Sequence, residues 1–299
     1  MKRDDMMLRD GIMSGQRILV TGGGSGLGRV MAEGFLILGA DVYICGRRES
    51  VVQETATALM EQHGGRVNAI ACDIRKPDEI DSMLETIWAD GGALTGLVNN
   101  AAGNFVSRTE EISMNGFDAI SSIVFRGTFN VTHACGKRWI EEGKPASVLS
   151  ILATWVWNGS AYTVPSAMSK AAINTMSQSL AVEWADRGIR FNCIAPGTFP
   201  TEGMSARLRP LDGDQAFRDT SDYPMGRVGR MPELANLAAY LMSPGAEYVT
   251  GQTIAIDGAR YLATGGNFAS LRSWTDEEWA ASRQSIKATT QKDKELRRG

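Results

Sequence analysis

The sequence has little of what metal centres, disulfide-linked domains and nucleic-acid-binding proteins require. Among its 299 residues are two histidines and four cysteines, and no two cysteines form a Cys-x-x-Cys pair. Neither a zinc site nor a disulfide framework is indicated, so we expect the cysteines to be buried, reduced thiols. The formal net charge of −3 provides no basic field, and we expect no nucleic-acid partner.

Long apolar runs are also missing. No stretch approaches the roughly 20 apolar residues that a membrane helix needs. The first residues, MKRDDMMLRDGIMSGQ, mix acids and bases and lack the apolar centre of a signal peptide. We therefore expect a soluble, cytoplasmic protein with no membrane partner. Unpaired cysteines suit such a reducing compartment.

A strand, a glycine-rich turn and a helix follow one another near the N-terminus. The run RILVT at 17–21 is typical of a strand, glycines crowd the turn from Gly22 to Gly28, and 29–38 has a helical pattern. This order places backbone N–H groups and the positive end of a helix against a phosphate. A second strand over 41–45 completes a βαβ unit. We therefore expect the ligand to be a dinucleotide.

The end of the second strand indicates which dinucleotide fits. An acidic residue there holds the 2′-hydroxyl of NAD, whereas an arginine accommodates the 2′-phosphate of NADP. The strand ends in Cys45-Gly46-Arg47-Arg48, without a carboxylate. We therefore expect NADPH/NADP, with Arg47 and Arg48 at the 2′-phosphate.

Strands and helices continue to alternate as far as residue 256. Strands are expected at 67–72, 97–100, 147–151, 189–195 and 253–256, and helices at 77–88, 116–140, 166–184 and 232–242. The fold class is therefore α/β, a doubly wound parallel Rossmann sheet with helices on both faces. Ligands bind at the carboxyl ends of the strands in such a fold.

The predicted organisation is an N-terminal arm (1–14), a single Rossmann domain (15–262) and a C-terminal helical extension (263–299). Residues 197–222 lie between a strand and a helix, where a lid over the active site is expected. In the extension, the Thr275-Asp276-Glu277-Glu278 sequence is a capping box that should start a helix. We expect the first half of this helix to dock on a neighbouring subunit.

Several motifs in this order resemble the short-chain dehydrogenase/reductases over about residues 15–262. They are TGxxxGxG from Thr21, Asn-Asn-Ala from Asn99, the helix that carries Lys170, and Pro-Gly-Thr from Pro196. The resemblance implies a Rossmann sheet, a nicotinamide cofactor, a small-molecule substrate and, as is usual in the family, a homotetramer.

The resemblance also implies a set of cofactor-binding residues. They are Gly22, Ser25, Gly26, Leu27 and Gly28 at the pyrophosphate, Asp73 and Ile74 at the adenine, Asn100 and Ala101 on the ribose side, Lys170 at the nicotinamide ribose, and Pro196, Gly197 and Thr198 at the carboxamide end.

The family's usual catalytic residues do not carry over. The tyrosine that precedes the lysine by one helical turn is Ser166 here, the serine on the strand before it is Ala153, and the asparagine of the long helix aligns with Val124. Reduction of a ketone needs an acid for the forming alkoxide, and a serine hydroxyl is too weak an acid for this task. An ordinary ketoreductase is therefore disfavoured.

One branch of the family lacks the same residues. NNAAGNF from Asn99 to Phe105, and VPSA before Lys170, resemble the 2,4-dienoyl-CoA reductases of fatty acid β-oxidation. In a dienoyl thioester, hydride goes to the far end of the conjugated system, and the thioester oxygen takes the negative charge before carbon is protonated. We therefore expect an acyl-CoA substrate, bound by Asn104, Phe105, Trp155 and Tyr162.

The proton donor stays open. Trp155 stands where mitochondrial-type enzymes carry a tyrosine, and an indole cannot supply a proton. Of the two aspartates of the peroxisomal type, one matches Asp257 and the other aligns with Ser122. Tyr162 is the only phenol near the lysine in sequence, and it is either a proton donor or a loop aromatic. The catalytic candidates are Lys170, Tyr162 and Ser166, the last as the holder of a water.

Two other functions remain open. The chain could act on a different carbonyl or alcohol substrate with Tyr162 as the acid. Alternatively, it could be a non-catalytic NADPH-binding scaffold or sensor, because three catalytic positions are lost. Retention of Lys170 speaks against this last reading, although ribose binding alone could explain that lysine.

Overall fold

The computed structural model describes residues 1–201, 220–221, 223–263, 275–282 and 284. In this part of the chain, seven parallel strands form one sheet in the order β3-β2-β1-β4-β5-β6-β7. The strands are β1 (Arg17–Thr21), β2 (Asp41–Gly46), β3 (Val67–Ala71), β4 (Gly96–Asn99), β5 (Ala146–Ile151), β6 (Ile189–Pro196) and β7 (Thr253–Ile256). The strand order reverses between β1 and β4, so a crevice is expected there at the carboxyl ends.

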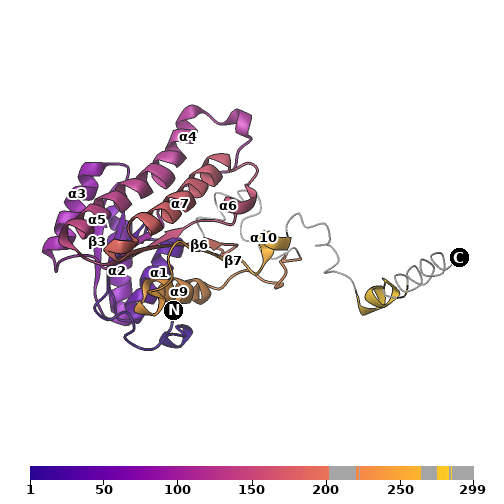
Figure 1. Ribbon diagram of the computed structural model, residues 1–299, viewed down its shortest axis with the longest axis horizontal. Coiled ribbons are helices and arrows are strands. Elements are labelled where there is room, and N and C mark those ends of the chain that lie inside the picture. Colours follow the sequence, from indigo (N-terminus) through magenta and orange to yellow (C-terminus); the bar gives the residue numbers. More distant parts are fainter. Residues whose placement is uncertain (202–219, 222, 264–274, 283, 285–299) are drawn as a thin grey trace.

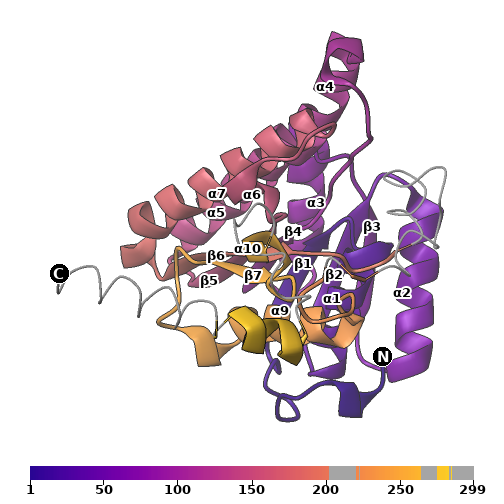
Figure 2. The same ribbon diagram turned by 90° about the vertical axis from the view of Figure 1, so that its right-hand side faces the viewer.

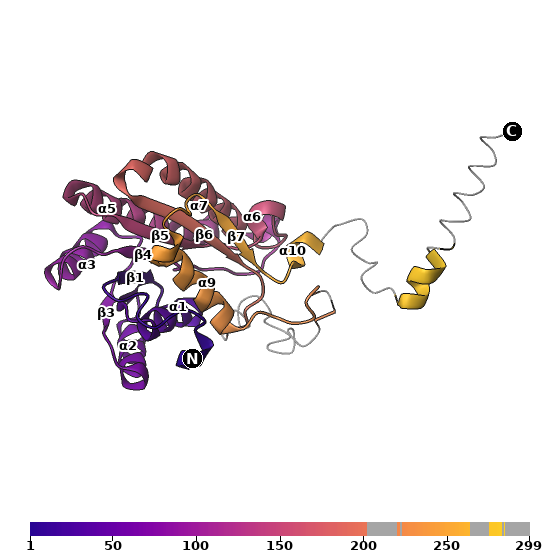
Figure 3. The ribbon, with the colours of Figure 1, turned by 60° about the horizontal axis from the view of Figure 1, so that its bottom comes forward.

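Helices cover both faces of the sheet (Figures 1 and 2). One face carries α1 (Gly26–Ile37), α2 (Glu49–His63) and α9 (Met231–Met242). The other carries α3 (Pro77–Ala89), α5 (Thr128–Glu142) and α7 (Val164–Glu183). Figure 3 shows the two helical layers with the sheet between them. The predicted doubly wound α/β fold is confirmed.

The central strands are mostly apolar because both of their faces are buried. Along β1, Ile18 and Val20 join the core on the α1 side, whereas Leu19 joins the core on the α5 side. Tyr43 of β2 also faces the second core. A parallel sheet between two helical layers requires this continuous hydrophobic pattern, and it explains why the strands could be found from the sequence.

The long helix predicted over 116–140 is not one regular α-helix. It consists of α4 (Met114–Ser121), a π-helical segment η3 (Ser122–Gly127) and α5. A Cβ added at Gly127 would lie 2.7 Å from Ile74 Cγ1, so glycine lets the π segment approach the loop after β3. Neither α2 nor the short α6 (Trp155–Asn158) was predicted from the sequence.

The N-terminal arm packs against the domain that follows it. Met6 and Met13 are buried in the core on the α1 and α9 side. The backbone N–H of Met7 donates to Asn236 Oδ1 at 2.7 Å, and Asn236 Nδ2 donates to the carbonyl of Asp5 at 2.8 Å. The arm therefore shares a core with the Rossmann domain.

Most of the expected lid (197–222) and of the C-terminal extension lies outside the described residues. The capping box is confirmed, because Thr275 N–H donates to Glu278 Oε2 at 2.7 Å and Glu278 N–H donates to Thr275 Oγ1 at 3.3 Å. Docking of this helix on another subunit stays a prediction.

All four cysteines are buried and unpaired, as the sequence predicted. None of the helices in the described ranges is both long and apolar enough to cross a membrane.

Candidate active site

The glycine-rich turn after β1 has the geometry expected of a phosphate-binding turn. Gly22 and Gly26 have φ values of +65° and +54°, which favour glycine. A Cβ at Gly28 would lie 2.4 Å from Asn100 Nδ2 and 2.5 Å from the Gly22 carbonyl oxygen. The Ser25 side chain makes no capping hydrogen bond to α1. Exposed N–H groups at the start of a helix fit a diphosphate.

The ends of β1 and β4 are joined by hydrogen bonds at the point where the strand order reverses. Thr21 Oγ1 accepts the backbone N–H of Asn100 at 3.0 Å and that of Ala101 at 3.1 Å. Asn100 Nδ2 in turn donates to the Thr21 carbonyl at 3.0 Å. Leu27, predicted with this group, lies half-buried in the first turn of α1. The structure thus brings the predicted pyrophosphate and ribose-side residues together.

Arginines surround the predicted adenosine end. Arg47 and Arg48 are exposed directly after β2. Asp73 is buried, and its carboxylate accepts from Arg75 Nε at 2.9 and 3.0 Å. This bond lowers the pKa of Asp73, with a smaller contribution from the charge of Arg47. The only carboxylate predicted here is therefore already paired, and the exposed charge is positive. Ile74 beside it is buried.

Lys170 is buried at the carboxyl end of β5. Its Nζ donates to the carbonyl of Ile151, the last residue of that strand. Burial lowers the pKa of Lys170 to about 8. Ser166 lies one turn earlier on the same face of α7 and is 4% exposed. Pro165 stands in the first turn of this helix, as predicted.

The remaining positions of the family's catalytic set carry no donor. Ala153 is half-buried in the loop after β5, and Val124 is fully buried in the π-helical segment. Asp257 is engaged with its own chain, because its carboxylate oxygens accept from Ala259 N–H at 2.9 Å and from Tyr261 N–H at 2.8 Å. Ser166 and Lys170 are therefore the polar pair on this side of the site.

The structure brings the predicted substrate-binding segments together. The carbonyl of Tyr162 accepts the N–H of Ser107 at 3.0 Å, which joins the loop after β4 to the loop after β5. The Tyr162 ring is 58% exposed, and its backbone φ is +63°. Asn104 Oδ1 accepts the N–H of Phe105 at 2.9 Å, and Phe105 packs on the apolar cluster around α4. Trp155 lies half-buried in α6.

Tyr162 is not the only phenol at this edge of the sheet. Tyr261 of α10 (Arg260–Ala263) stacks on Trp157, with ring centroids 4.7 Å apart. Tyr223 donates to Thr198 Oγ1 at 2.8 Å. A search among the sequence neighbours of Lys170 finds neither tyrosine, because Tyr223 follows β6 and Tyr261 follows β7, whereas the search covered the loop after β5. The rule that carboxyl ends of parallel strands share one edge would have found them.

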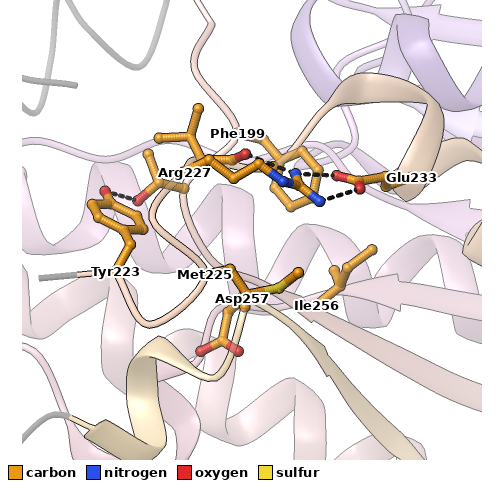
Figure 4. Close-up of a pocket in the computed structure, with 11 residues that line it drawn as sticks. Phe199, Tyr223, Met225, Arg227, Glu233, Ile256 and Asp257 are labelled. Carbon is orange, nitrogen blue, oxygen red and sulfur yellow. Dashed lines mark hydrogen bonds and ion pairs between the residues drawn. The ribbon is translucent and has the colours of Figure 1, made fainter. Parts of the chain in front are cut away.

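A cavity of about 270 Å³ lies beyond the carboxyl ends of β6 and β7 (Figure 4). Thr198, at the predicted carboxamide end, lines it together with Phe199 and Asp257. Pro196 and Gly197 lead into it, and the Gly197 N–H donates to the carbonyl of Ile256 at 3.0 Å. The cavity therefore begins where the nicotinamide end of the cofactor is expected.

An ion pair forms part of the wall of this cavity. Arg227 donates to the two carboxylate oxygens of Glu233 at 2.6 and 2.9 Å (Figure 4). The pair lowers the pKa of Glu233 to about 2. It ties the chain that returns from the predicted lid to the first turn of α9.

Known proteins match this chain over most of its length. A family model described as enoyl-(acyl carrier protein) reductase matches residues 22–259. A Caenorhabditis elegans protein named probable 2,4-dienoyl-CoA reductase decr-1.2 [(3E)-enoyl-CoA-producing] is 39% identical over 98% of this chain and 96% of its own.

Solved structures agree with the family and the fold. A short chain dehydrogenase from Bacillus anthracis is 36% identical, with a TM-score of 0.77 over 85% of this chain and 100% of its own. A gluconate 5-dehydrogenase from Burkholderia cenocepacia in complex with NADP and tartrate is 28% identical, with a TM-score of 0.77 over 84% of this chain and 97% of its own. The chain therefore belongs to the short-chain dehydrogenase/reductase family and is a nicotinamide-dependent oxidoreductase.

Proposed function

We propose that this protein reduces unsaturated acyl-CoA thioesters, as a 2,4-dienoyl-CoA reductase does, in the β-oxidation of unsaturated fatty acids. The observation that carries the proposal is a buried Lys170 in a cofactor site of the family type, with Ser166 and Ala153 where a ketoreductase has its acid and donor. The name of the C. elegans relative supports the same reaction.

The reaction suits a site without a phenol beside the lysine. A bound nicotinamide supplies the hydride, and the charge that develops on the substrate collects on the thioester oxygen. Stabilising that oxygen requires a hydrogen-bond donor. The bond that Asn104 Oδ1 accepts from the Phe105 N–H orients the Asn104 side chain. Its Nδ2 group can only donate hydrogen bonds. We assign this donor to the thioester oxygen.

Protonation of the dienolate falls to the other side of the site. A buried lysine with a pKa of about 8 is mostly an ammonium at neutral pH, and so it holds a proton next to Ser166. A serine hydroxyl can orient a water but cannot itself act as the acid. We therefore infer that Lys170 and Ser166 together hold the water that protonates the α-carbon.

The purified protein should oxidise NADPH only when a 2,4-dienoyl-CoA is added. In D2O, the product should be a 3-enoyl-CoA with one solvent deuterium at C2, since hydride is added at the far end of the diene. Mass spectrometry and NMR of the product provide the check.

Two results would contradict this assignment. Turnover of ketones or alcohols, but of no dienoyl-CoA at any chain length, would favour a different substrate, and a Tyr162→Phe variant would then test Tyr162 as the acid. Tight NADPH binding without any turnover would favour a scaffold or sensor.

Activity should fall as the pH rises through the pKa of Lys170. Since burial lowers that pKa to about 8, the ammonium form is present below about pH 8 and is lost above it. In Lys170→Arg the cation persists, so the fall should move to higher pH even though the rate decreases. Lys170→Met should lower kcat by at least about 100-fold. The pH profile of kcat/KM measures the shift, and kcat at saturating substrate measures the loss in Lys170→Met.

The exposed Lys137 of α5 provides the control, because a Lys137→Met variant loses a lysine that is remote from the site. A basic limb that stays in place in Lys170→Arg would show that another group titrates.

We propose NADPH as the preferred cofactor. Arg47 and Arg48 stand exposed at the end of β2, and Arg75 already neutralises the nearby Asp73. The adenosine end therefore offers positive charge to a 2′-phosphate, and the Asp73 carboxylate is already paired.

Replacement of Arg47 and Arg48 by alanine should weaken NADPH binding by about 10- to 100-fold, the value of one hydrogen bond of about 1.5–3 kcal/mol to the charged 2′-phosphate. NADH binding should stay within about threefold, because NADH has no such phosphate. Fluorescence titration with each cofactor measures the ratio. Arg187→Ala, which removes an exposed arginine far from β2, is the control. Equal losses for both cofactors would refute the assignment.

We also propose that the protein is a homotetramer. Apolar side chains are exposed along one helical face, with Phe125, Phe129, Met168 and Val182 each at least 44% exposed. A hollow of about 810 Å³ lies on the same face, lined by α4, η3 and α7. An apolar surface of this kind marks an interface, and a two-fold axis would pair it with itself. The C-terminal helix is proposed to dock on a neighbour in the same assembly.

Light scattering should give the mass of four chains. Glutamate at both Phe129 and Met168 should lower that mass by burying charge in the interface. Met7→Glu changes a more exposed apolar side chain on the N-terminal arm and should leave the mass unchanged. A monomeric wild-type protein would refute the tetramer.

The cytoplasmic location stays a proposal, consistent with four free cysteines.

A further inference from the structure

Three side chains from separate segments meet at the carboxyl end of β6. Thr198 follows that strand, Tyr223 lies where the chain returns to the domain, and Arg260 begins α10. Tyr223 donates its hydroxyl hydrogen to Thr198 Oγ1 at 2.8 Å. In Figure 4 a dashed line marks the interaction of the Tyr223 hydroxyl. Arg260 Nη1 donates to Thr198 Oγ1 at 3.0 Å and to the Tyr223 hydroxyl oxygen at 2.9 Å.

This triangle determines how the Thr198 hydroxyl can bond. A guanidinium group only donates hydrogen bonds, and a threonine hydroxyl has two acceptor positions and one hydrogen. Thr198 Oγ1 accepts from Arg260. In the pair of hydroxyls the phenol of Tyr223 is a stronger acid than the aliphatic alcohol and is therefore the donor to Thr198 Oγ1, so both acceptor positions of Thr198 are used. The single Thr198 hydrogen is left to donate outwards. A hydroxyl group that could otherwise donate or accept is thereby restricted to donating.

Packing holds the triangle in place. Tyr223 is 8% exposed, and the Arg260 guanidinium carbon lies 4.1 Å from the centre of its ring, within the range of a cation–π contact. Asp257 caps α10 through the N–H groups of Ala259 and Tyr261, which fixes the start of the helix that carries Arg260. A nearby positive charge also strengthens the hydrogen bond that Thr198 donates.

We propose that Arg260 and Tyr223 are positioning residues that make Thr198 donate to the carboxamide oxygen of the nicotinamide. A carboxamide has one accepting oxygen and one donating NH2 group. A threonine restricted to donating selects the oxygen and thereby one orientation of the group. This inference rests on the nicotinamide site of the proposed function, at which Thr198 stands at the carboxamide end.

The test compares three ligands by direct binding, so it needs no turnover. They are NADPH, its thionicotinamide analogue, whose sulfur is a weak acceptor, and 2′,5′-ADP, which lacks the nicotinamide. Wild type should bind NADPH about tenfold more tightly than the thio analogue, the value of about one good hydrogen bond. Tyr223→Phe, Arg260→Gln and Thr198→Val should each reduce this ratio by about three- to tenfold, with 2′,5′-ADP binding unchanged.

A double-mutant cycle shows whether the effect passes through the threonine. In a Thr198→Val background, Tyr223→Phe should have no further effect on the ratio. Tyr261→Phe is the matched control, because it removes a hydroxyl from a neighbouring tyrosine of α10 that stacks on Trp157 instead. Its ratio should equal that of wild type.

A wild-type ratio in both Tyr223→Phe and Arg260→Gln would overturn the proposal. So would an equal loss for all three ligands, which would indicate a role in folding alone. Failure of the proposed function would appear differently, as normal binding ratios without turnover of any acyl-CoA. If NADH binds in place of NADPH, the same ratio is measured with NADH, its thio analogue and AMP.

Discussion

The active site depends on the hydrogen bonds by which Thr21 holds the ends of β1 and β4 together. One hydroxyl oxygen accepts two consecutive backbone N–H groups, those of Asn100 and Ala101. These bonds fix the glycine-rich turn after β1 on one side of the crevice and the start of the loop after β4 on the other. Because the strand order reverses at this point, no other strand pair could connect the two halves of the site.

From that point the site extends along the edge of the sheet in the order of the strands. The loop after β4 bonds to the loop after β5 through Ser107 and Tyr162. Tyr261 of α10 stacks on Trp157 of α6, and Arg260 bonds to Thr198 after β6. Each loop is thus held by a neighbour that is distant in sequence. Contacts of this kind between loops hold the side chains of the site in place even where a single loop would not be rigid.

The sequence predicted what depends on local pattern. Strands buried on both faces, the glycine turn and the capping box at Thr275 all carry their signal within a few residues, and the structure has them where expected. The π-helical segment was not predictable in this way, because it depends on how Gly127 meets Ile74 from another element. Tyr223 and Arg260 were not predicted as site residues for the same reason, because their partner Thr198 is distant in the sequence.

Burial of Lys170 links the stability of the fold to its protonation. The pKa falls from an ordinary value of 10.5 to about 8 in the folded chain, so the unfolded chain binds more protons between these two values. The free energy of unfolding therefore rises with pH over that interval as far as this group is concerned, and the cost of the buried charge is largest below it. The pH range in which Lys170 carries the proton that the proposed reaction uses is thus the range in which its burial most destabilises the protein.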